Sequence, residues 1–194
     1  MPERRERQNS ILIVSGSEHF ERVIRKAAAG KGFIAIDVRN SASAARRCAL
    51  ERYYDIVVID APLKDEPGHE LALDIAYKYN TSIMMASPPE IFGDINDLVI
   101  DSGVLVILKP LSDHGTENSI RFLSAEQNRF RELENRLIKA EEKAEEIRAV
   151  SRAKIILMEK KHISEEDAHR LIGKLAMNNG VSRKRIAEKI IEDA

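Results

Sequence analysis

The sequence predicts an α/β fold: a doubly wound sheet of five parallel strands, followed by one long helix and a small all-α module of three helices. Three observations lead to this prediction. From Ile11 onward, short apolar runs alternate with helical patterns, which is typical of a parallel sheet covered by helices on both faces. Residues 116–161 contain neither proline nor glycine and are rich in charged side chains. Shorter helical patterns, separated by turn residues, follow.

The expected strands are short apolar runs, as strands buried on both faces require. They cover residues 11–15, 33–37, 56–59, 83–86 and 104–108. Helical patterns lie between them, at residues 18–29, 41–52, 69–79 and 91–101. We therefore expect a first domain at residues 11–115, preceded by a flexible arm at residues 1–10.

The long helix carries apolar side chains that recur every seven residues, with a second set at the offset positions. This is the pattern of a coiled-coil seam. The seam residues are Leu123, Phe130, Leu133, Leu137, Ala140, Ala144 and Ile147. An apolar seam has to be buried, and the chain has no second long helix. We therefore expect residues 116–150 to pair with a second copy of the chain in a homodimer.

Residues 151–194 are expected to form a three-helix module. The first helix ends near Lys161, and Ser164 then begins a second helix with acidic residues in its first turn, as in a capping box. Gly180 ends that helix, because glycine tolerates the left-handed cap conformation. Ser182 can cap a short third helix.

This module resembles the ANTAR domain, the RNA-binding module of bacterial transcription antitermination regulators, from Val150 to about Ile191. The residues that carry the resemblance are Arg152-Ala153-Lys154, Leu157-Met158, Ser164-Glu165-Glu166-Asp167-Ala168, Arg170-Leu171 and Lys174-Leu175-Ala176-Met177. Composition alone would assign its basic residues to solvated helix surface. The resemblance instead implies contacts with RNA, for which the candidates are Lys154, His169, Arg170, Lys174, Arg183 and Lys184.

The first domain is similar to a response-regulator receiver, since Asp60 ends its third strand and Lys109-Pro110 ends its fifth. In such a fold the site lies at the carboxyl ends of the strands. Aspartyl phosphorylation requires a divalent metal held by carboxylates, yet Ser15-Gly16 stands where the resemblance implies an acidic pair, and Ala86 stands where it implies a hydroxyl. We expect a receiver-like domain that is not phosphorylated, with Asp60 held by Lys109. Its input would be a partner protein or a small ligand.

Composition bounds the remaining possibilities. The 194 residues are 43% hydrophobic, enough for one or two domains with a substantial core, and the net charge of −1 confines any nucleic-acid contact to a local surface. The single cysteine, Cys48, allows no disulfide within the chain. No apolar run approaches the ~20 residues that cross a membrane, and the polar N-terminus is unlike a signal peptide, so we expect a cytoplasmic protein.

Motifs for catalysis, cofactors or metals are missing from the sequence. It has no glycine-rich phosphate loop, no nucleophile motif, and no cysteine or histidine pair at metal-ligand spacing. We therefore expect no enzymatic activity, no cofactor and no metal site. The favoured function is a dimeric antitermination regulator that binds paired RNA hairpins. The alternatives are a DNA-binding response regulator, which three short helices behind a receiver suggest, and a signalling adaptor that contacts protein only.

Overall fold

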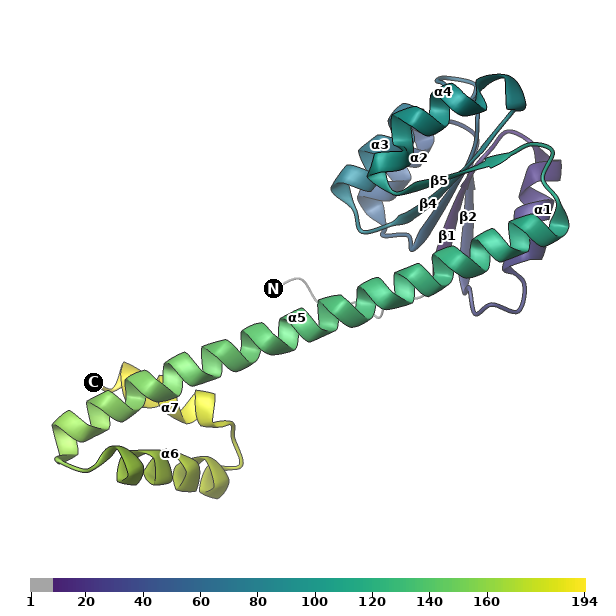
Figure 1. Ribbon diagram of the computed structural model, residues 1–194. Coiled ribbons are helices and arrows are strands. Elements are labelled where there is room, and N and C mark those ends of the chain that lie inside the picture. The colour runs from purple at the N-terminus through teal and green to yellow at the C-terminus, as the bar shows by residue number, and fades with distance from the viewer. Residues whose placement is uncertain (1–8) are drawn as a thin grey trace. The chain divides into compact units, whose positions relative to one another are not determined.

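The computed structural model describes residues 9–194, so the arm expected at residues 1–10 falls outside the described residues except at its last two positions. The chain divides into two compact units, one ending at Arg131 and the other covering Glu132–Ala194. Helix α5, Asp113–Lys161, contributes to both units (Figure 1).

The first unit contains five parallel strands in the order β2-β1-β3-β4-β5. The strands are β1 Ser10–Val14, β2 Ala35–Arg39, β3 Ile56–Asp60, β4 Ser82–Ser87 and β5 Val104–Leu108. The helices are α1 Glu18–Ala28, α2 Ala42–Glu51, α3 His69–Lys78 and α4 Pro89–Val99, with a short 3-10 turn, η1, at Ile100–Ser102. This arrangement confirms the fold class predicted from the sequence.

The core lies on both faces of the sheet, because successive strand residues point to opposite sides. Leu12, Val57 and Ile59 face one side and pack against α2, α3 and α4. Ile11 and Val58 face the other side, where α1 and the first part of α5 cover the sheet (Figure 1). Since both faces are covered, nearly every residue of the central strands is buried, and this explains their continuous apolar runs.

Two of the element boundaries that differ from the sequence prediction have a local explanation. The second strand begins at Ala35 rather than at residue 33, because the backbone turns after α1 through Gly30 and Gly32, both with positive φ. The long helix begins at Asp113, three residues earlier than expected. Ser112 Oγ accepts a hydrogen bond from the backbone N–H of Gly115 and so caps the first turn.

Helix α5 is tied to the amino-terminal edge of the sheet by buried polar contacts. Arg131 forms an ion pair with Asp55, whose carboxylate also accepts hydrogen bonds from the backbone and side chain of Ser10. One turn earlier, the Gln127 amide donates to Ser82 Oγ at 3.0 Å and to the Asn80 carbonyl at 3.1 Å. The first unit therefore includes α5 as far as Arg131.

Leu123 shows why this part of α5 cannot belong to an exposed seam. It is 1% exposed and packs in the core between α5 and the sheet, so its predicted place in the dimer seam is wrong. Its neighbour Phe122 is 62% exposed instead. The heptad repeat places Leu123 in line with Phe130 and Leu137, but the sheet already buries that turn of the helix.

The second unit packs the end of α5 against α6, Glu165–Asn179, and α7, Arg183–Glu192. Small and branched side chains from all three helices fill its core: Val150, Ala153, Leu157, Ala168, Ile172, Ala176, Ile186 and Ala187. The predicted caps are present. Ser164 Oγ accepts from the Asp167 N–H at 3.1 Å, Ser182 Oγ accepts from the Arg185 N–H at 3.2 Å, and Gly180 ends α6 in the left-handed conformation.

Candidate functional site

The first candidate site lies at the carboxyl ends of the strands in the first unit. Asp60 is the last residue of β3, Ser15 follows β1 and Lys109 follows β5. The ammonium group of Lys109 forms an ion pair with Asp60 Oδ1 and donates a hydrogen bond to the Ala61 carbonyl at 2.5 Å. The predicted pairing of Asp60 with Lys109 is therefore present.

Ser15 completes this arrangement in a way that the sequence analysis missed. Its hydroxyl donates to Asp60 Oδ2 at 2.5 Å and accepts from the Ser17 N–H at 2.9 Å. Both carboxylate oxygens of Asp60 are thus engaged by groups of the chain itself. At this position the Ser15 hydroxyl donates a hydrogen bond to Asp60, whereas a carboxylate in its place would bind a metal cation together with Asp60. Within residues 9–194, no group of three acidic, histidine or cysteine side chains is placed to hold a metal ion.

The neighbouring strand offers no hydroxyl to this site. Ala86 lies directly opposite Asp60 in the parallel pairing of β3 and β4. The next residue, Ser87, is fully buried, and its hydroxyl donates to the carbonyl of Pro88. Glu18 occupies the first turn of α1, where its charge complements the helix dipole.

The acidic pair in the loop after β3 has structural partners. The carboxylate of Asp65 accepts from the backbone N–H groups of Ala42 and Ser43 at the start of α2, and these hydrogen bonds lower the pKa of Asp65 to about 2. Glu66 accepts from the Leu71 N–H at the start of α3 and pairs with Arg46. Both residues therefore fix helix ends and are not free to bind a ligand.

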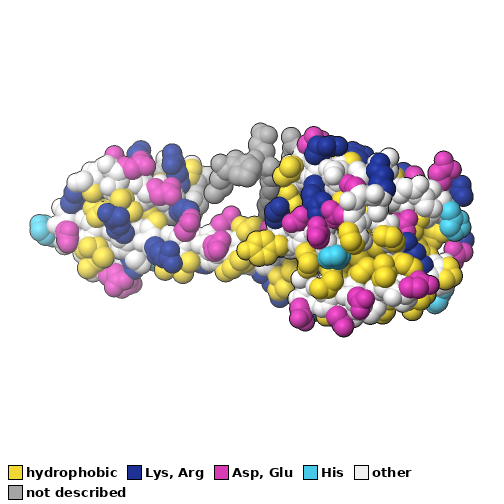
Figure 2. Space-filling view, turned by 90° about the horizontal axis from the view of Figure 1, so that it is seen from above, with side chains coloured by type: hydrophobic (Ala, Val, Ile, Leu, Met, Phe, Trp, Pro, Cys, Tyr) yellow, Lys and Arg dark blue, Asp and Glu magenta, His cyan; other side chains and the backbone are white. Residues whose placement is uncertain are grey.

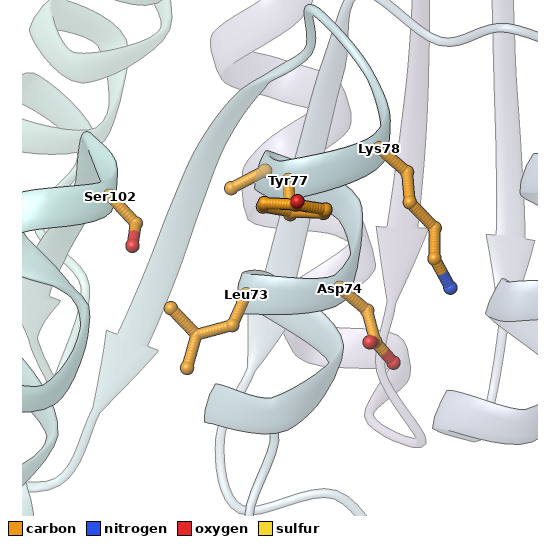
Figure 3. Close-up of a pocket in the computed structure, with 6 residues that line it drawn as sticks. Leu73, Asp74, Tyr77, Lys78 and Ser102 are labelled. Carbon is orange, nitrogen blue, oxygen red and sulfur yellow. The ribbon is translucent and has the colours of Figure 1, made fainter.

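A shallow hollow of about 460 Å³ lies on the surface beside α3, lined by Leu73, Asp74, Ala76, Tyr77, Lys78 and Ser102. Tyr77 is 93% exposed there. In Figure 3, Leu73 points toward Ser102, whereas Asp74 and Lys78 lie on the opposite side of α3. The hollow thus combines the apolar side chains of Leu73 and Ala76 and the ring of Tyr77 with two charges of opposite sign.

The second candidate site is a cleft of about 180 Å³ in the second unit, where α5, α6 and α7 meet. Its lining consists of Lys143, Glu146, Ile147, Val150, Ser151, Lys154, His169 and Arg183. Three of the six residues predicted to contact RNA, namely Lys154, His169 and Arg183, are brought together here from three different helices. Lys143 adds a cation that the sequence analysis did not select, because the resemblance found in the sequence began only at Val150.

The other three predicted residues do not line this cleft. Lys184 lines a separate hollow and pairs with Glu145 at 2.5 Å, while Arg170 pairs with Asp167 at 2.7 Å. Lys174 is exposed on α6. The six residues therefore divide into a group of three at the cleft and three outside it.

Carboxylates partly neutralise the positive charge of this surface. Lys154 donates to Glu165 at 2.5 Å, and Lys143 donates to Glu146 at 2.8 Å. Each hydrogen bond lowers the pKa of the carboxyl group concerned, and Arg183 adds a Coulombic contribution at Glu146. All of these acids are charged near neutral pH, so an anion would have to compete with them for the cations.

Within the second unit, α5 presents an apolar stripe to solvent, made of Leu133, Leu137, Ala140, Ala144 and Ile147. These residues share one side of the helix, since they are spaced three or four apart. Phe130, in the first unit, is also exposed. Figure 2 shows hydrophobic side chains, in yellow, on the exposed surface of the chain. Exposed apolar side chains grouped in this way are typical of a surface that a partner covers.

Comparison with known proteins identifies relatives of both units. Residues 139–191 match the model of the ANTAR domain. The transcriptional regulatory protein PdtaR of Mycobacterium tuberculosis is 30% identical over 144 residues, covering 71% of this chain and 67% of that protein.

Solved structures resemble the first unit in fold. The signal receiver domain of an HD domain-containing protein from Pseudomonas fluorescens Pf-5 has a TM-score of 0.58 at 20% identity, over 66% of this chain and 95% of the other. Chemotaxis response regulator CheY4 of Vibrio cholerae has a TM-score of 0.52 at 14% identity, over 60% of this chain and 98% of the other. In residues 9–194, no helix combines the length and apolar character that crossing a membrane requires.

Proposed function

The chain belongs to the ANTAR-domain response regulators, and from this premise we propose that it is a dimeric RNA-binding antiterminator. It would bind paired short hairpins in nascent RNA in the cytoplasm and so prevent a terminator from forming. The observation that carries the proposal is the cleft in the second unit. Lys154, His169 and Arg183 come from three helices and converge there, as a surface for the RNA backbone and an unpaired base would require.

Dimerisation would raise the affinity of this surface for RNA. A single small module with a few cations binds RNA weakly, and two modules joined in one assembly gain affinity through effective concentration when the target carries two hairpins. The apolar stripe on α5 supports such an assembly. Leu133 and Leu137 are about half exposed in the single chain, and a second α5 would cover them.

The input would reach the first unit without phosphorylation. Ser15 and Lys109 already engage both oxygens of Asp60, and the position of Ser15 supplies no carboxylate for a metal. A partner protein or a small ligand is the input that this arrangement favours. The hollow beside α3 is one surface for it.

The RNA-binding proposal is tested by comparing hairpin RNA with duplex DNA of the same sequence in a gel-shift assay. We expect the full chain to bind the RNA. Lys154→Ala should weaken binding and reduce the slope of log affinity against log salt by about one, because one phosphate contact is lost. Lys189→Ala, which removes an exposed cation of α7 away from the cleft, is the matched control and should have little effect.

The alternatives predict different gels. Preference for the duplex DNA would favour a DNA-binding regulator. Absence of binding to either nucleic acid would favour an adaptor that contacts protein only.

The dimer is tested by sedimentation of a variant with Leu133→Lys and Leu137→Lys together. We expect a monomer with a folded first unit, because neither residue belongs to that unit. Ile138→Lys is the control, since Ile138 lies on the same helix but off the apolar stripe. The monomeric variant should bind one hairpin as well as the wild type does and lose the advantage of two. A wild type that is already monomeric would show that the stripe has another role.

The third test is incubation with acetyl phosphate and magnesium, followed by mass spectrometry. We expect no stable modification of Asp60, and substantial modification would refute the proposal for the input.

A further inference from the structure

The cleft between α5, α6 and α7 has an apolar floor and a charged rim. Ile147 and Val150 provide hydrocarbon from one side of α5. Lys143 and Lys154 from α5, His169 from α6 and Arg183 from α7 surround it. A site of this kind suits a group with an apolar face and a negative charge, which describes one nucleotide.

We propose that the cleft holds a single unpaired nucleotide of the bound RNA, its base against Ile147 and Val150 and its phosphate at Lys143 and Arg183. This inference rests on the proposed RNA-binding function and assigns the place of contact. The cleft has a volume of only about 180 Å³, which suits one base rather than a base pair. The bound nucleotide has to be splayed out from a loop, as sequence-specific RNA recognition generally requires.

Arg183 has room to adjust to a phosphate. Its guanidinium lies over Gly173 of α6, where an added Cβ would stand 3.9 Å from Nε and 4.0 Å from Nη2. Glycine at this position therefore leaves the guanidinium without a side chain beneath it. Lys154 is paired with Glu165 and Lys143 with Glu146, whereas Arg183 has no ion pair within residues 9–194, so Arg183 is the principal cation that we assign to the phosphate, with Lys143 beside it.

Glu146 gives the cleft a basis for choosing among bases. Its carboxylate pairs with Lys143 and lies near Arg183, and both cations favour its ionised form. An ionised carboxylate only accepts hydrogen bonds, so it binds a base edge that presents an N–H donor, either an amino group or a ring N–H, and it repels an edge that presents only acceptors. The base preference of the cleft should therefore depend on Glu146.

The test fills the cleft. Ser151 lies on its wall and is exposed, so Ser151→Trp occupies the space of the base and keeps every charge. Asn178→Trp adds the same bulk at an exposed position of α6 outside the cleft and is the matched control. The probe is a fluorescently labelled RNA with two hairpins, whose loop is selected by the full-length wild type from a pool of randomised loops. Each loop position is then made abasic in turn, and affinity is measured by anisotropy.

We expect one loop position at which the abasic change weakens wild-type binding about tenfold, as loss of a stacked base does. Ser151→Trp should bind the intact RNA about tenfold more weakly and should lose less than a further twofold at that position. Asn178→Trp should behave as the wild type. Glu146→Gln supplies a readout that does not depend on bulk, since an amide also donates and should change the base preference at the same position.

Two results would overturn the inference while leaving RNA binding intact. In one, Ser151→Trp, shown to be folded by circular dichroism, binds the intact RNA as tightly as the wild type. In the other, it binds weakly but keeps the wild-type sensitivity at every loop position. If the wild type selects no hairpin at all, the proposed function fails, and the assignment of the cleft fails with it.

Discussion

Replacing Arg131 with methionine should destabilise the first unit by about 2 to 3 kcal/mol. Removing one partner of a buried ion pair costs roughly 3–5 kcal/mol, because the other charge is left without compensation. The Asp55 side chain is 3% exposed, but that of Arg131 is 24% exposed, which lowers the cost. Asp55 also keeps its hydrogen bonds from Ser10. Arg131 Nε, moreover, is buried without a partner among the described residues, so its removal relieves part of the loss.

A second ion pair between α5 and the first unit provides the control. Lys26 pairs with Asp113, and the two side chains are 70% and 66% exposed. Exposed pairs contribute little, so Lys26→Met should change stability by less than about 0.5 kcal/mol. Each substitution removes the cation of one ion pair between α5 and the rest of the first unit, and the two pairs differ chiefly in burial.

Native-state hydrogen exchange measures the effect in the full chain, since buried amides of β1 and β3 report on the first unit alone. Their exchange free energy should fall for Arg131→Met and stay nearly constant for Lys26→Met. Adding Asp55→Asn to Arg131→Met should recover part of the loss, because the uncompensated charge disappears. Equal changes in the two single variants would refute the argument from burial.

Three further outcomes are expected. The pKa of Asp65 is about 2, against 3.8 for the free carboxyl, so the stability that its ionised form contributes is full above about pH 4 and is lost as pH falls through 2. NMR titration of its carboxyl carbon should give the low pKa, and Asp65→Asn should lower stability at neutral pH. Gly173→Ala should raise the stability of the second unit by about 0.5 to 1 kcal/mol in thermal unfolding, because Gly173 lies inside a helix and an added Cβ makes ordinary contacts. Gly180→Ala should lower the stability by about 1 kcal/mol, because Gly180 has a φ of 62°. Ser15→Asp should increase the affinity for Mg²⁺ measured by calorimetry, since it places a second carboxylate beside Asp60, and unchanged affinity would show that Ser15 is not what excludes the metal.

The sequence predicted the fold because its signals were local and agreed with one another. The buried strands are apolar runs, and Ser164, Gly180 and Ser182 mark helix ends through chemistry that acts within a few residues. Leu123 was misplaced because a heptad repeat records which side chains are apolar and not which surface covers them. Burial against the sheet and burial against a second chain both require apolar side chains, so the two produce the same pattern in the sequence.

The candidate sites were only partly visible in the sequence. The ion pair of Asp60 and Lys109 was predicted from their places at strand ends. The hydrogen bond from Ser15 was missed, because the sequence shows that serine replaces a metal-binding carboxylate but does not show which group the hydroxyl contacts instead. The cleft depends on side chains brought together from three helices. Lys143 in particular has no local signal that separates it from the other charges of α5.

Ile147 belongs to both the apolar stripe and the lining of the cleft. If a second chain covers the stripe while a nucleotide occupies the cleft, this one side chain contacts both ligands, and the two binding equilibria become thermodynamically linked. By reciprocity, the factor by which dimerisation changes RNA affinity equals the factor by which RNA changes the dimer affinity. A cell could then regulate RNA binding through the concentration of the protein alone, with each transcript that carries two hairpins favouring assembly of the dimer that binds it.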